Sequence, residues 1–120
     1  MKRTILSAMA VGVLCMSPAH SEAMKRIKTE ADYRALIVGN TFGNEKGDWV
    51  TVNADGSMNG QFGGKEFSGK WLWKGSYWCR NGVLGGQEIG SDCQVVEFDG
   101  RTLRNVRKKG KGDTALFTLK

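Results

Sequence analysis

The sequence contains one histidine and one proline in 120 residues. The histidine, His20, lies in an N-terminal segment that we expect export to remove, so the mature chain has none. Histidine is the side chain that most often serves as a general base or a metal ligand near neutral pH. Its absence excludes serine–histidine and cysteine–histidine nucleophile pairs and histidine-containing metal sites from the mature chain.

Other catalytic arrangements lack a supporting pattern. Ser68 and Lys70 stand two residues apart, which on a strand only places both side chains on one face. Four carboxylates that could act in pairs are scattered along the chain: Asp48, Glu66, Glu88 and Asp92. We therefore predict no catalytic residue, no metal site, no cofactor and no enzymatic activity.

The first 23 residues are typical of a secretory signal peptide. Lys2 and Arg3 form a positive start, residues 5–16 are apolar, and Pro18 precedes a small-residue cleavage site after Ala23. The apolar run is too short for a permanent membrane anchor. The sequence predicts a periplasmic or secreted protein in which residues 24–120 form a single domain.

The charge is moderately positive, with a formal net charge of +6 for the full sequence. In an exported protein, this excess favours contact with an anionic envelope surface or an acidic protein. Nucleic acid is not an expected partner, because it is not normally present in that compartment.

Export also permits a disulfide, since the periplasm and the extracellular space are oxidising. Cys79 and Cys93 are the two cysteines of the mature chain, and we predict that they are bonded. A loop of about 15 residues closed in this way gains roughly 3 kcal/mol in the chain-entropy model.

The pattern along the mature chain predicts one short helix followed by strands. Thr29 and Asp32 resemble a capping box, and Gly39 and Asn40 would end the helix. Short β-favouring runs separated by glycine turns then fill the chain, and residues 81–92 resemble a glycine-rich loop. The expected strands are 48–53, 57–62, 66–74, 77–83, 93–98, 101–107 and 114–120. The predicted fold is mainly β, an antiparallel up-and-down sheet or small barrel of about seven strands with one short N-terminal helix.

Two clusters are candidate binding surfaces. Trp71, Trp73, Trp78 and Arg80 could stack on a saccharide or line an apolar pocket, whereas core packing is the alternative explanation for the aromatic residues. A basic run could dock anions, or could simply be a solvated hairpin. The run consists of Arg101, Arg104, Arg107, Lys108, Lys109 and Lys111.

Four segments carry a resemblance: 68–73 (SGKWLW), Tyr77–Arg80 (YWCR), 92–96 (DCQVV) and 109–117 (KGKGDTALF). Together they resemble a family of small secreted alphaproteobacterial proteins of unknown function. The resemblance implies a lipocalin-like or avidin-like mini-barrel. Members of that family often carry the automated name dihydrodipicolinate reductase, which would imply nicotinamide chemistry.

These patterns support three functional hypotheses. The favoured one is an exported, non-catalytic binding or accessory module of the cell envelope that works through the 81–92 loop and the aromatic strand beside it. The alternative is a small protein inhibitor of an envelope-directed protease or lysozyme. The reductase is disfavoured, because the one glycine motif, 110–115 (GKGDTA), has only five residues after it and cannot open a dinucleotide-binding helix.

Nicotinamide cofactors should therefore not bind. We expect calorimetric titration of residues 24–120 with NADH and with NADPH to give no saturable heat. A dissociation constant in the micromolar range would contradict both the fold prediction and the functional one, because both depend on the absence of a dinucleotide fold.

Overall fold

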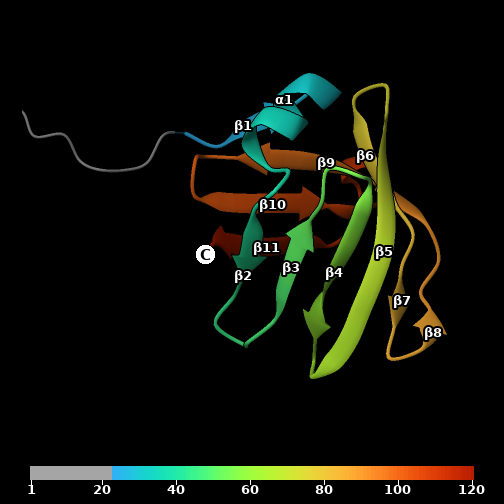
Figure 1. The fold of residues 1–120 in the computed structure, drawn as a ribbon. Helices are drawn as coiled ribbons and strands as arrows, with labels where there is room; N and C mark the ends of the chain where they lie inside the picture. The colour runs from blue at the N-terminus through green and yellow to red at the C-terminus, as the bar shows by residue number, and fades with distance from the viewer. Residues whose placement is uncertain (1–22) are drawn as a thin grey trace, which may run out of the picture.

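A computed structural model describes residues 23–120, which fold into a β-barrel with two short helices (Figure 1). The predicted signal peptide lies outside the described residues, apart from Ala23 at its end. The helices and strands are β1 (Lys25–Ile27), α1 (Glu30–Leu36), β2 (Thr41–Gly43), β3 (Trp49–Val52), β4 (Ser57–Phe62), β5 (Lys65–Lys74), β6 (Tyr77–Arg80), β7 (Val83–Leu84), β8 (Gln87–Glu88), β9 (Asp92–Phe98), β10 (Thr102–Val106), α2 (Arg107–Gly110) and β11 (Thr114–Leu119).

Eight antiparallel strands close the barrel in the order β2, β3, β4, β5, β6, β9, β10 and β11, and β11 pairs with β2. This is the up-and-down barrel that the sequence predicts. Closure leaves no long unpaired edge within these eight strands.

The alternating burial of the strands fills the barrel interior. Along β5, Phe67 and Trp71 are buried while the residues between them are mostly exposed. Along β9, Gln94, Val96 and Phe98 are buried on the inner face. These alternations reflect the two-residue period of a strand.

Helix α1 lies across one end of the barrel (Figure 1). The Thr29 side chain caps the helix by accepting a hydrogen bond from the Asp32 N–H, as the sequence predicts. Tyr33 points into the barrel and is nearly inaccessible to solvent, and Ile37 is fully buried. Arg34 on the outer side donates a hydrogen bond to the Ala54 carbonyl in the β3–β4 turn. The helix therefore closes that end of the barrel.

The disulfide prediction is confirmed. Cys79 on β6 and Cys93 on β9 are bonded and face each other in the β6–β9 ladder. The bond therefore lies on the seam where the barrel closes.

Two sequence expectations need correction, and two short strands were not expected. Residues 81–92 are not one open loop, because β7 and β8 pair with each other and β7 also pairs with Phe67 and Ser68 of β5. The strand expected at 77–83 ends at Arg80. The short strands β1 and β2 were not expected, since three residues are too few to show a period.

The turn after β10 has an unusual backbone. Lys108 and Lys109 both have left-handed φ values, 54° and 56°, which residues other than glycine rarely adopt. The Asp92 carboxylate accepts the Lys108 N–H at 3.2 Å and so fastens this turn to β9. The turn itself was expected from the sequence, but its conformation was not.

Breaking the disulfide should loosen the seam. We expect the double variant Cys79→Ser/Cys93→Ser to lose about 3 kcal/mol of unfolding free energy, which corresponds to a thermal midpoint lower by roughly ten to twenty degrees. Differential scanning calorimetry checks this, with reduced wild-type protein as the control that should melt at the same lowered temperature. A midpoint within two degrees of the oxidised wild type, on the order of 0.5 kcal/mol or less, would contradict it.

Candidate functional site: a two-walled cavity inside the barrel

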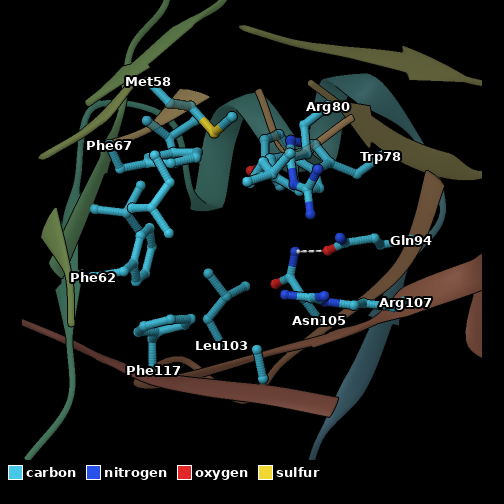
Figure 2. A pocket seen from close by; sticks show the side chains of 16 residues that line it. Met58, Phe62, Phe67, Trp78, Arg80, Gln94, Leu103, Asn105, Arg107 and Phe117 are labelled. Carbon is cyan, nitrogen blue, oxygen red and sulfur yellow. Dashed lines mark hydrogen bonds between the residues drawn. The ribbon is translucent and has the colours of Figure 1, made fainter. Parts of the chain in front are cut away.

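A cavity of about 270 Å³ lies inside the barrel beneath α1 (Figure 2). Two of its lining residues, Ile89 (44% exposed) and Arg107, are exposed, and they mark the side on which the cavity meets solvent. The lining residues are Tyr33, Val50, Val52, Met58, Phe62, Phe67, Trp78, Arg80, Leu84, Ile89, Gln94, Leu103, Asn105, Arg107, Ala115 and Phe117.

The lining divides into two chemically different walls. One wall is apolar and comes from β3, β4, β5 and β11, with Met58, Phe62, Phe67 and Phe117 prominent in it (Figure 2). Phe62 packs edge-on against both Phe67 and Phe117, with ring centroids 5.0 and 5.9 Å apart. These edge-to-face contacts join the three phenyl groups into one continuous apolar surface.

The other wall is polar and comes from β6, β9, the end of β10 and the first residue of α2. We call it the polar wall; it consists of Trp78, Arg80, Gln94, Asn105 and Arg107, which Figure 2 shows on the side opposite the phenylalanines. Strand pairing sets Trp78 opposite Gln94. The two walls therefore give the cavity an amphipathic interior.

A short hydrogen-bond chain orients the amides of the polar wall. Gln94, only 4% exposed, donates from Nε2 to the Asp92 carboxylate at 3.1 Å. Asn105 in turn donates from Nδ2 to Gln94 Oε1 at 2.9 Å (Figure 2). Because a carboxylate can only accept, Asp92 fixes which atom each amide presents to the next.

Two buried polar atoms of this wall have no hydrogen-bond partner. They are the indole Nε1 of Trp78, a residue only 6% exposed, and Oδ1 of Asn105. Buried polar groups in folded proteins are almost always hydrogen-bonded, and each exception needs an explanation. Here one donor and one acceptor on the polar wall are unpartnered.

The two arginines of the polar wall have no acidic partner. Two ion pairs occur within residues 23–120, Arg34 with Glu30 and Arg104 with Glu97, and neither involves Arg80 or Arg107. Burial lowers the pKa of Arg80 and repulsion from Arg107 lowers it further, whereas Asp92 acts in the opposite direction. Arg80 donates to the Gly90 carbonyl at 3.2 Å, which leaves other N–H groups of its guanidinium for further contacts.

Tyr33 adds a neutral polar group to the roof of the cavity. Burial raises the pKa of its hydroxyl well above the usual value. The phenol is therefore uncharged at all physiological pH values, and the arginines are the charged side chains that line the cavity.

The candidate aromatic residues separate into two places. Trp78 and Arg80 line the cavity, but Trp71 and Trp73 do not. The rings of Trp71 and Trp73 pack against Tyr33, at centroid distances of 5.2 and 5.3 Å, and the Arg34 guanidinium lies 4.9 Å from the Trp71 ring. Helix α1 thus occupies indole surface that a sugar ring would need.

The residues of the basic run also lie in separate places. Arg107 belongs to the polar wall, Arg104 is paired with Glu97, and Arg101 lies at the other end of β10. The remaining three, Lys108, Lys109 and Lys111, border a shallow surface depression with Ser91, Asp92 and Cys93. The run is therefore not one continuous patch.

Gln94, Asn105 and Tyr33 were not singled out by the sequence. A signal for Asn105 is the imperfect alternation of its strand, in which the apolar residues Leu103 and Val106 are three positions apart and cannot share a face. Leu103 faces inward and the β9–β10 register continues without a bulge, so the residue two positions later must also face inward. That residue is an asparagine.

No group of three or more potential metal-binding side chains lies within residues 23–120. In the same part of the chain, no helix is both long and apolar enough to cross a membrane.

Family models, curated proteins and solved structures give no match to this chain. The resemblance to small secreted proteins stays a prediction, and the cavity itself is the basis for a functional conclusion.

Two buried tryptophans provide a matched test of the unpartnered indole. Trp71 Nε1 donates to the Asn53 carbonyl at 3.1 Å, whereas Trp78 Nε1 has no partner, and both residues are almost fully buried. We expect Trp71→Phe to lower the unfolding free energy by about 1 kcal/mol more than Trp78→Phe does, because only the first removes a hydrogen bond. Urea denaturation of both variants measures the difference. Equal losses would show that the Trp78 N–H is already satisfied in the free protein.

Proposed function

We propose that this chain is an exported, non-catalytic binding protein whose barrel takes up one small ligand. The observation that carries the proposal is the unfilled interior. Barrels of eight strands are either filled by side chains or hold one small ligand. The volume of about 270 Å³ that the side chains leave open supports the second kind for this barrel.

The energetic argument points the same way. The apolar wall of the open cavity leaves phenyl surface in contact with water, and covering such surface is favourable by about 25 cal/mol per Å². A ligand whose apolar part lies against that wall would gain this free energy. Selection for packing alone would favour larger side chains at positions such as Ala115, which lines the cavity.

Binding rather than catalysis is proposed because of the chemistry of the lining. Among the described residues around the cavity, the ionisable side chains are two arginines and a phenol whose pKa is raised. Arginine holds its proton and does not act as a base near neutral pH. These groups can hold and orient a ligand.

The disulfide supports the exported part of the proposal, since such bonds persist in oxidising compartments. The inhibitor alternative has less support. The 81–92 segment, which would have to engage an enzyme, pairs with β5 and contributes Leu84 and Ile89 to the cavity.

A larger side chain in the cavity should weaken ligand binding without unfolding the barrel. We expect Ala115→Leu to weaken binding of a small apolar probe, 1-octanol, at least about tenfold, because the added carbons occupy the void, while thermal stability stays the same or rises. Protein NMR titration measures both the affinity and the location of the shifted resonances.

Leu116→Phe is the matched control, because Leu116 is 54% exposed and faces outward on the same strand. It should bind 1-octanol as the wild type does. Unchanged binding in Ala115→Leu, or shifts confined to the outer surface of the wild type, would contradict the proposed function.

A further inference from the structure

The polar wall of the cavity has the chemistry of an anion site. Arg80 and Arg107 turn their guanidinium groups toward the same space, as Figure 2 shows, and neither has a carboxylate in ion-pair contact within residues 23–120. Two like charges on a partly desolvated wall repel each other, and a bound anion would relieve that repulsion. Arginine binds carboxylates through paired N–H groups and is suited to this role.

The strand register limits the charge of that anion. Asp92 lies directly opposite Arg80 across the β6–β9 ladder and already contributes one negative charge near it. Counted together with Asp92, the two arginines that line the cavity carry a net charge of about one positive unit. A singly charged group balances this better than a phosphate, which carries close to two negative charges at neutral pH.

The unpartnered indole points to the same kind of group. Trp78 Nε1 can only donate, and it belongs to a residue of the polar wall that stands two positions before Arg80 in the sequence. The Trp78 N–H therefore lacks a hydrogen-bond acceptor on the same wall that carries the two unpaired arginines. A carboxylate supplies acceptor oxygens and negative charge together.

The apolar wall defines the rest of the ligand. A cavity of about 150 Å³ holds benzene, so 270 Å³ holds roughly ten non-hydrogen atoms. Phe62, Phe67 and Phe117 offer that portion of the ligand hydrocarbon contact and no hydrogen bond. An acid of about eight carbons, counting the carboxyl carbon, matches the available volume.

We infer that the ligand is a medium-chain monocarboxylate whose chain lies against Phe62, Phe67 and Phe117, and whose carboxylate accepts hydrogen bonds from Arg80, Arg107 and the Trp78 indole. This inference rests on the proposed function and deepens it.

Asn105 adds a preference among such acids. Its Oδ1 is an unpartnered acceptor whose orientation is fixed through Gln94 by Asp92. A hydroxyl group near the carboxylate would donate to it. We therefore expect 3-hydroxyoctanoate to bind more tightly than octanoate, and equal or weaker binding would remove Asn105 from the head-group site.

The experiment compares three ligands of one chain length on the disulfide-intact mature protein. Octanoate, 1-octanol and octylammonium differ in the charge of the head group and little in size. Titration calorimetry at neutral pH should give octanoate at least about tenfold higher affinity than 1-octanol, and octylammonium the lowest. The hydrophobic effect alone predicts the reverse for the first pair, because the alcohol leaves water more readily.

Matched variants locate the head group. Arg107→Met should weaken octanoate binding about tenfold and leave 1-octanol binding unchanged, while Arg101→Met, the same exchange at an exposed turn position, should change neither. Trp78→Phe should weaken octanoate binding several-fold, and Trp71→Phe, away from the cavity, should not.

The two levels of the proposal fail in different ways. If 1-octanol binds as tightly as octanoate and Arg107→Met has no effect, the barrel is a binding protein but the carboxylate inference is wrong. If no member of the series binds, both the inference and the proposed function are wrong. Octanoate binding that survives Ala115→Leu would place the acid outside the cavity and would also overturn the inference.

Discussion

The pairing of β9 with both of its neighbours is the constraint on which the rest of the structure depends. One edge of β9 pairs with β10, and the other is shared, with residues 92–94 bound to β6 and residues 96–98 bound to β1. Without the β6–β9 contacts the sheet would be open and the two walls could not face each other. The disulfide joins the central one of the three residue pairs of the β6–β9 ladder.

Much of the fold could be predicted from the sequence, because local patterns determine it. The strand Ser57–Phe62 was predicted with its observed bounds. The turn before it, at 55–56, and the turn between β9 and β10, at 99–100, are Asp-Gly pairs that favour hairpins. The two- and three-residue strands were missed, since their place in the sheet is decided by pairing with distant strands. Their own sequences are too short to show alternation.

The site was predictable only in pieces. Trp78 and Arg80 were named for their aromatic neighbourhood, and Arg107 as a member of a basic run. Their meeting on one wall depends on registers such as Arg80 with Asp92 and Asn105 with Ala115, which no local pattern specifies. Gln94 and Asn105 escaped notice because an isolated amide on a strand normally faces solvent, and only closure of the barrel turns these two inward.

The position of the disulfide links redox state to the shape of the interior. Trp78 and Arg80 flank Cys79, and Gln94 follows Cys93, so the same bond that shuts the barrel also aligns three side chains of the polar wall. In a reducing environment this ladder would depend on its hydrogen bonds alone, and the indole and guanidinium would lose their fixed spacing. Under the proposed function, a chain that folds without this bond would therefore bind its ligand less tightly than the same chain after oxidation.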